Sequence, residues 1–410
     1  MKKIFLFLSF TVQFLFAQNS KVLTGADILL SDSLDLVTNK NVGIVTNHTG
    51  LLSNGTHIVD TLNSLNQVNV VVLFGPEHGI RGDAPDGHSI SDGKDSKTGI
   101  QVYSLYGKTK KPTKEMLKNV DILVFDIQDI GARFYTYIST MFFAMQAAVE
   151  NNIPILILDR PNPINGIRVE GPIIQEGFKS FVGIANIPIM HGMTIGELAL
   201  FFNEENLLNE NLKADLKIIK MQNWTRNMYF DETGLTWVNP SPNMTSLETA
   251  LLYPGLCLIE GTNISEGRGT PTPFLNIGAP FINSDSLISK LNSYKLEGIS
   301  YSKINFTPVE IPNMASKPKF EKENCNGIYF TITDRQKLNS LKLGLVLIYS
   351  IMKLNPNDFS FRESSIDRLY GSSNLRTMLT KGFSPNEIMN TWKQDLEKFN
   401  QIRKKYLIYN

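Results

Sequence analysis

The sequence predicts an α/β fold in which a parallel sheet is covered by helices on both faces and is followed by a smaller C-terminal α/β domain. Three observations support this prediction. Short runs of apolar, often β-branched residues recur in the first part of the 410-residue chain, segments of helical length separate them, and polar residues follow each run directly. Strands that are apolar throughout and alternate with helices are typical of a parallel sheet buried on both faces.

The elements of the first domain can be placed from this pattern. Strands are expected at residues 42–46, 68–74, 121–125, 153–158 and 255–259, and helices near residues 56–65 and 138–150. In open α/β sheets, ligands bind beyond the carboxyl ends of the strands. The pattern therefore predicts a site among the polar residues that follow the strands, namely Asn47, Glu77, Asp126, Asp159 and Glu260.

A Gly/Pro-rich segment at residues 267–280 interrupts the alternation. We therefore expect a first domain of residues 21–275 and a C-terminal auxiliary domain of residues 276–410. The elements expected in the second domain are an amphipathic helix near 284–296, a strand at 327–332, and helices near 337–352 and 385–406. Apolar residues recur at helical spacing along the last helix, which indicates a side that packs on the core: Met389, Trp392, Leu396, Phe399, Ile402 and Tyr406.

Net charge and the N-terminus limit the partners and the compartment. The chain has 40 basic and 39 acidic residues, so it lacks the basic excess of proteins that bind nucleic acid or anionic membranes. Residues 1–17 combine Lys2 and Lys3 with an apolar run and a final Ala17, which predicts a signal peptide and a periplasmic or secreted protein. No later apolar stretch reaches the ~20 residues of a membrane-spanning helix.

Cysteines and common motifs narrow the chemistry. Cys257 and Cys325 are permitted to pair outside the cytoplasm, but Cys257 lies in an apolar run and is expected to be a core thiol. The sequence contains no GxSxG, Walker A, HExxH or GxGxxG motif, so no cofactor is assigned. His48 and His78 both follow strands, which keeps a metal-dependent hydrolase as an alternative, although their spacing does not require a metal.

Carboxylates are the better catalytic candidates, because glycoside hydrolysis typically uses two of them. Glu77 follows a strand within Gly75-Pro76-Glu77-His78-Gly79, a composition that favours a sharp turn. Asp126 ends the next apolar strand. If the two strands are neighbours, ~4.8 Å apart, the carboxyl groups fall within roughly 5–10 Å. The alternatives are a surface ion pair for Glu77 and a turn-capping role for Asp126.

Other polar and aromatic residues in these loops are candidates for substrate binding. Phe134, Tyr135 and Tyr137 offer rings on which sugars pack, although such residues are equally common in cores. Arg133, Arg160 and Arg268 could bind a carboxylate through a two-pronged contact, or could form structural ion pairs. The segment 260–270 is rich in glycine and polar residues, and could either cradle an acetamido or carboxylate group or form a hinge between domains.

At these segments the chain resembles the exo-β-N-acetylmuramidase family. The resemblance covers nearly all of the chain after residue 20. It is carried by GIVTNHTG (43–50), GPEHG (75–79), FDIQDIGARFYTY (125–137), DRPNP (159–163), MHGMTIGE (190–197) and EGTNISEGRGT (260–270). It implies a Rossmann-like catalytic domain, an auxiliary domain, a site in the cleft between them, and release of β-linked N-acetylmuramic acid from the non-reducing ends of peptidoglycan fragments.

The resemblance makes Glu77 the leading catalytic candidate, expected to protonate the glycosidic oxygen. Asp126 and Glu266 are the candidates for the second carboxylate, chosen from their positions. Substrate contacts are expected from Asn47, His48, His78, Gln128, Arg133, Tyr135, Asp159, Arg160, His191, Asn263 and Arg268. A sugar-binding protein without catalytic activity is the alternative from another functional class.

Overall fold

The computed structural model describes residues 21–82, 92–208 and 212–410. The predicted signal peptide, residues 1–17, therefore lies outside the described residues. Among those that are described, no helix is both long and apolar enough to span a bilayer.

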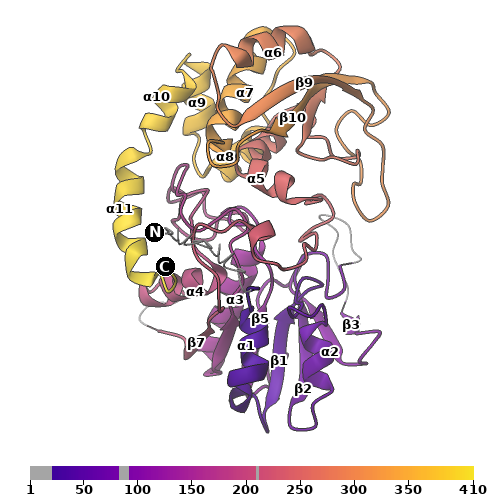
Figure 1. Cartoon of the computed structure of the whole chain (residues 1–410), viewed down its shortest axis with the longest axis vertical. Helices are drawn as coiled ribbons and strands as arrows, with labels where there is room; N and C mark the ends of the chain where they lie inside the picture. The colour runs from indigo at the N-terminus through magenta and orange to yellow at the C-terminus, as the bar shows by residue number, and fades with distance from the viewer. Residues whose placement is uncertain (1–20, 83–91, 209–211) are drawn as a thin grey trace, which may run out of the picture.

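The first domain is built on a mixed sheet whose strand order is β3-β4-β2-β1-β5-β6-β7 (Figure 1). All neighbouring strands run parallel except β3 and β4, which are antiparallel. The α/β prediction is thus confirmed. The strands are β1 (Asn41–Thr46), β2 (Asn69–Gly75), β3 (Gly93–Lys94), β4 (Gln101–Ser104), β5 (Ile122–Asp126), β6 (Ile155–Leu158) and β7 (Leu216–Ile219).

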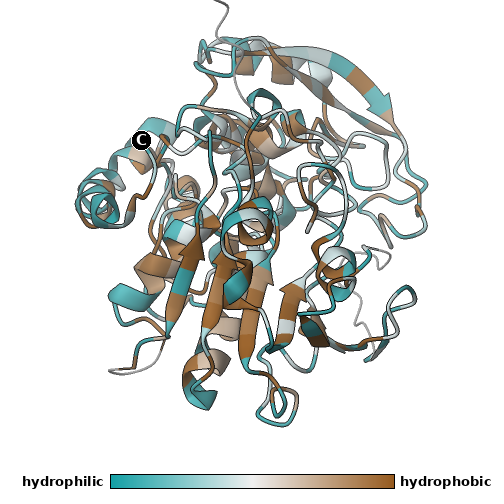
Figure 2. Cartoon of the chain, turned by 60° about the horizontal axis from the view of Figure 1, so that its bottom comes forward, coloured by the Kyte–Doolittle hydropathy of each residue, from teal (hydrophilic) through white to brown (hydrophobic). Residues whose placement is uncertain are grey.

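Helices cover both faces of this sheet, and the central strands are accordingly hydrophobic (Figure 2). Successive residues of one strand enter different cores: Ile44 packs in a cluster with residues of α1 and α2, and Val45 in a cluster with residues of α3 and α4. This two-sided burial explains why the strands are apolar without alternation. The helices are α1 (Gly25–Asp32), α2 (Ile58–Asn63), α3 (Tyr137–Asn151) and α4 (Ile195–Glu204).

The C-terminal domain contains a three-stranded antiparallel sheet in the order β8-β10-β9. Its strands are β8 (Asn276–Ala279), β9 (Ile299–Phe306) and β10 (Cys325–Ile332). Its helices are α5 (Leu247–Leu256), α6 (Ser284–Asn292), α7 (Ser340–Leu354), α8 (Glu363–Tyr370), α9 (Asn374–Thr380), α10 (Pro385–Asn390) and α11 (Lys393–Arg403). Among the described residues of both domains, short 3-10 helices span Leu34–Leu36, Phe230–Glu232, Cys257–Gly261 and Lys404–Tyr406.

The chain returns to the first domain at its end, because α11 runs down the side of the molecule toward α4 (Figure 1). Phe399 and Tyr406 contact Phe201 of α4, with ring centroids 5.9 and 5.7 Å apart. Trp392 and Phe399 are buried, so the predicted core-facing side of this segment is confirmed. The predicted single helix is instead divided between α10 and α11.

One predicted strand, residues 255–259, is wrong. These residues form the end of α5 and the 3-10 helix Cys257–Gly261. A short apolar run has too little periodicity to distinguish a strand from a buried helix. Gly255 lies against α7 so closely that a Cβ atom there would sit 1.7 Å from the carbonyl oxygen of Ser340. The glycine therefore permits a close helix contact.

The packing of α5 on α7 also bears on the domain boundary, because it joins α5 to the C-terminal domain. α5 precedes the predicted boundary at residue 275 and packs on α7 beyond it, and the boundary itself stays a prediction. The two cysteines, Cys257 and Cys325, are buried free thiols, as expected of core residues.

Arg133 joins the two domains. Its side chain is fully buried and donates four hydrogen bonds to carbonyl oxygens, at 2.6 Å to Pro172, 2.9 Å to Ile187, 3.0 Å to Leu369 and 2.9 Å to Tyr370. The first two acceptors belong to the first domain and the last two end α8. Burial lowers the pKa of Arg133 to about 9, which still leaves the guanidinium charged at neutral pH. We call this arrangement the arginine clamp.

Replacing Arg133 with alanine is expected to lower the free energy of unfolding by about 3 kcal/mol or more, because four buried carbonyl groups lose their donor. Arg335→Ala is the matched control. Arg335 also bridges the domains, through Asp231 and Glu232, but these ion pairs are partly exposed and such pairs contribute about 1 kcal/mol or less. Denaturant unfolding measures the free energy of unfolding of both variants. Equal losses in the two would contradict the role given to the arginine clamp.

Candidate active site

A cleft of about 710 Å³ lies between the two domains. Residues of the first domain, of the segment 241–274 and of α8 line it together: Glu77, His78, Tyr106, Phe134, Tyr135, Thr136, Tyr137, Val182, Ser241, Asn243, Met244, Tyr253, Cys257, Glu260, Arg268, Phe274 and Leu369. Of these residues, Glu77 and Glu260 carry carboxyl groups.

The turn after β2 positions Glu77. The amide of Gly79 donates to the carbonyl oxygen of Pro76 at 3.0 Å, which closes a tight turn around Glu77 and His78. His78 has a φ of 72°, a left-handed conformation that is costly for a residue with a side chain. At the start of α3, the Thr136 hydroxyl donates to Glu77 Oε2 at 3.0 Å. The predicted sharp turn is therefore present, and it presents Glu77 to the cleft.

Glu260 reaches the cleft from the 3-10 helix Cys257–Gly261. Arg268 Nη2 donates to Glu260 Oε1 at 2.9 Å. Burial raises the pKa of Glu260, and the charge of Glu266 acts in the same direction, while the charge of Arg268 opposes both. The side chain nevertheless keeps 26% of its surface accessible. Glu260 is thus a carboxyl group that retains its proton more strongly than a free glutamate while remaining open to a ligand.

Glu266 lies next to this pair, in a different setting. Its carboxylate is 2.9 Å from Lys319 Nζ and 3.5 Å from Arg268 Nε, and 5% of its side chain is exposed. Burial alone would favour the neutral form, but the two cations hold the pKa of Glu266 below its usual value. Glu266 lines an adjoining recess rather than the cleft.

Aromatic rings form much of the cleft wall. Tyr135 contacts Tyr137 and Tyr253 edge to face, with centroids 5.0 and 6.0 Å apart. Tyr253 also contacts Phe134 at 5.4 Å and Phe274 at 5.0 Å. The Tyr137 hydroxyl donates to the carbonyl oxygen of Pro240 at 2.5 Å, which fixes that ring. Such a wall offers flat apolar surfaces beside polar groups, as a pyranose requires.

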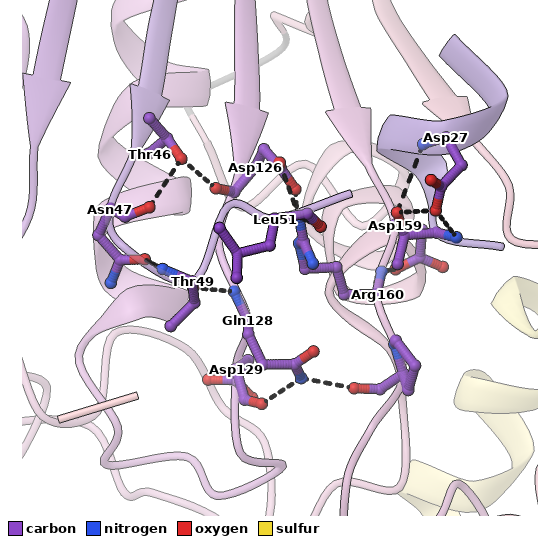
Figure 3. A network of polar contacts seen from close by, with 12 residues as sticks. Asp27, Thr46, Asn47, Thr49, Leu51, Asp126, Gln128, Asp129, Asp159 and Arg160 are labelled. Carbon is purple, nitrogen blue, oxygen red and sulfur yellow. Dashed lines mark hydrogen bonds and ion pairs between the residues drawn. The ribbon is translucent and has the colours of Figure 1, made fainter. Parts of the chain in front are cut away.

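Four of the predicted site residues meet in this cleft: Glu77, His78, Tyr135 and Arg268. Asp126 does not join them. The condition for their pairing is not met, because the two strands are not neighbours: β1 lies between β2 and β5. Asp126 is fully buried, and Arg160 donates to both of its carboxylate oxygens, at 2.6 and 2.8 Å (Figure 3). Asp126 and Arg160 therefore form a structural ion pair that ties β5 to the residues after β6.

Other predicted contacts near the strand ends are also engaged within the protein (Figure 3). Asn47 Oδ1 accepts from the amide and hydroxyl of Thr49. The Gln128 side-chain amide donates to two carbonyl oxygens, those of Asp129 and Pro161. Asp159 accepts from Thr194, Gly196 and Tyr409, and burial raises its pKa to about 6.

The remaining predicted contacts lie outside the residues that line the cleft. His48 Nε2 hydrogen-bonds the carbonyl oxygen of Asn239 at 2.8 Å. His191 is fully buried, and burial lowers its pKa to about 3, so it is neutral. Asn263 is held between Asp358 and Ser360, and Arg133 forms the clamp. Across the described ranges, no three His, Cys, Asp or Glu residues are grouped to hold a metal ion.

Sequence reasoning placed Glu260 near the site but chose Glu266 as the catalytic candidate. The segment EGTNISEG contains both glutamates, and spacing alone does not tell which one faces the cleft. Tyr253 and Phe274 were missed for a similar reason, because they belong to α5 and to the segment before β8, which only the fold brings to the cleft.

Comparison with known proteins gives a consistent result. The N-terminal model of the exo-β-N-acetylmuramidase NamZ family matches residues 42–248 and the C-terminal model matches residues 251–409. The chain is 49% identical over 394 residues to the peptidoglycan β-N-acetylmuramidase NamZ of Bacillus subtilis (strain 168), covering 96% of this chain and 92% of that protein.

Solved structures are similar as well. Crystal structures of two DUF1343 family proteins from Bacteroides fragilis match with TM-scores of 0.87 and 0.78, at 35% and 36% identity. Each match covers 95% of this chain and 99% of the other. Because the two family models together extend from β1 to the end of the chain, and nearly half of the aligned residues are shared with a curated relative, this chain belongs to the exo-β-N-acetylmuramidase NamZ family.

Proposed function

We propose that this chain is an exo-acting glycoside hydrolase that releases β-linked N-acetylmuramic acid from the non-reducing ends of peptidoglycan fragments. Family membership supports the reaction and the substrate. The observation that carries the assignment to a site is the pair Glu77 and Glu260, two carboxyl groups from the two sides of one cleft. Paired carboxyl groups are the usual apparatus of glycoside hydrolysis.

The environments of the two groups suggest their roles. Glu260 has a raised pKa and is the better proton donor to the departing glycosidic oxygen. Glu77 accepts a hydrogen bond from Thr136 and is the better carboxylate, acting on water or on the positive charge that develops at the sugar. This assignment differs from the expectation that Glu77 donates the proton. The aromatic wall around Tyr135 and Tyr253 would hold the sugar ring between the carboxyl groups of Glu77 and Glu260.

The two roles are separated by changing the leaving group. Glu260→Gln is expected to lower kcat/KM on a muramic acid–glucosamine disaccharide by about 10²–10⁴-fold, the usual contribution of acid catalysis, while a nitrophenyl glycoside, which needs little protonation, is affected far less. Glu77→Gln is expected to impair both substrates severely. Steady-state rates on the two substrates test this.

The same assay contains its controls. Glu266→Gln removes a neighbouring carboxylate that does not line the cleft, and is expected to retain activity on both substrates at a pH below the alkaline limb of the profile. The reversed pattern, in which Glu77→Gln keeps its kcat/KM on the nitrophenyl glycoside but loses it on the disaccharide, would make Glu77 the proton donor. Saturable sugar binding by the wild type without any release would favour the non-catalytic alternative.

The pH dependence gives an independent test of Glu260. An acid catalyst works only while protonated, so kcat/KM should fall as the pH rises through the raised pKa of Glu260. Arg268 lowers this pKa and Glu266 raises it. Arg268→Met should therefore move the alkaline limb of the profile to higher pH, and Glu266→Gln should move it to lower pH. Shifts of the same sign in both variants would contradict the assignment.

We also propose that the protein acts outside the cytoplasm, where its substrate lies. The support is the pattern of residues 1–17. Expressed in its host, the protein should be recovered in the periplasmic or secreted fraction with its N-terminus near Gln18. Recovery in the cytosol with Met1 retained would overturn this proposal.

A further inference from the structure

A recess of about 630 Å³ adjoins the cleft and shares Glu260 and Arg268 with it. Its other walls come from the segment 314–319, from Glu266 and from the residue that precedes α8. The ionisable side chains that line it are four cations and two carboxylates: Arg268, Lys317, Lys319, Arg362, Glu260 and Glu266.

The two carboxylates are already neutralised within this group. Arg268 donates to Glu260 at 2.9 Å and lies 3.5 Å from Glu266. Lys319 is 2.9 Å from Glu266 and also donates to the carbonyl oxygen of Ile264 at 2.8 Å. These contacts occupy Arg268 and Lys319, so the two remaining cations determine the net charge of the recess.

Lys317 and Arg362 are those two cations. Both side chains are exposed, and neither is ion-paired with a carboxylate in the described parts of the chain. Their positive charge faces a concave surface, where it attracts an anion more effectively than on a flat one. The recess thus has the charge of an anion site, immediately beside the proposed proton donor Glu260.

The segment that carries Lys317 is held in place. Lys319 anchors one end to the backbone of the Glu260–Glu266 segment, and the side chain of Asn243 donates to the carbonyl oxygen of Met314 at 2.7 Å at the other. Lys317 itself has a φ of 48°, a conformation that persists only where the surroundings impose it. The backbone that carries Lys317 is therefore fixed before a ligand binds, which lowers the ordering cost of binding.

We propose that this recess binds the lactyl carboxylate of the terminal N-acetylmuramic acid, with Lys317 and Arg362 as the recognising cations. The inference rests on the proposed function, and it locates the specificity for muramic acid over N-acetylglucosamine. The two sugars differ by the lactyl ether, whose carboxylate is the one anionic group that the substrate's terminal residue carries. A sugar held against the aromatic wall would direct this substituent past Arg268 into the recess.

The test compares substrates that differ in this one charge. Wild type and the Lys317→Ala/Arg362→Ala double variant are assayed on a nitrophenyl β-N-acetylmuramic acid glycoside and on its neutral lactyl carboxamide. On the acid, the double variant is expected to lose about 10- to 100-fold in kcat/KM, mainly through KM, since charge-assisted hydrogen bonds disappear. On the carboxamide it should match the wild type. Arg368→Ala, an exposed arginine of α8 outside the recess, should leave both unchanged.

Two outcomes would overturn the proposal. Equal losses on acid and carboxamide would assign Lys317 and Arg362 a structural role. A loss confined to a disaccharide, with both nitrophenyl glycosides unaffected, would assign the recess to the leaving sugar.

Calorimetry with free N-acetylmuramic acid and N-acetylglucosamine separates this inference from the proposed function, because it requires no turnover. Suppose that the wild type hydrolyses no substrate but binds N-acetylmuramic acid, and that the double variant does not bind it. The proposed reaction is then wrong, and the proposed role of the recess is supported. If the wild type and the double variant each bind the two sugars with equal affinity, the recess does not recognise the lactyl carboxylate and the inference is wrong.

Discussion

The arginine clamp is the constraint on which the rest of the molecule depends. Burying a guanidinium is costly unless acceptors surround it, and Arg133 donates through Nη1 and Nη2 to carbonyl oxygens of both domains. The same segment continues directly into Phe134, Tyr135 and Thr136, which line the cleft, and the Thr136 hydroxyl donates to Glu77. The contact that fixes the distance between the domains therefore also fixes the aromatic wall of the cleft. A site with one carboxyl group from each side of the cleft needs that rigidity.

The polar residues at the strand ends explain why the site lies to one side of the sheet. The C-terminal segments cover this edge, so its polar groups are buried and must be paired. Asp126 is paired with Arg160, and Asp159 binds the Tyr409 hydroxyl near the end of the chain. These residues consume their hydrogen-bonding capacity within the protein. The turn after β2 instead lines the cleft, which leaves Glu77 facing it.

The sequence was sufficient for local features and insufficient for pairings between distant segments. Apolar runs located β1, β2, β5 and β6, and the composition of Gly75–Gly79 predicted the turn that presents Glu77. Strand order is a long-range property, so the insertion of β1 between β2 and β5 could not be read from periodicity. For the same reason Asp126 looked catalytic, because its partner Arg160 is distant in sequence. Glu260 lines both the cleft and the recess, whereas Glu266 lines the recess alone and is paired there with Lys319. This difference depends on the fold of segment 314–319, which spacing in the sequence does not reveal.

The central claim is that the scissile bond lies between Glu77 and Glu260. The most direct measurement is a crystal structure of the Glu77→Gln/Glu260→Gln variant with an intact muramic acid–glucosamine disaccharide. The account predicts the glycosidic oxygen between the two side chains, within hydrogen-bonding distance of residue 260. A separate hollow of about 460 Å³, lined in part by Gln128 and Arg160, is the competing location at the strand ends. A disaccharide seated there, with the cleft empty, would contradict the account.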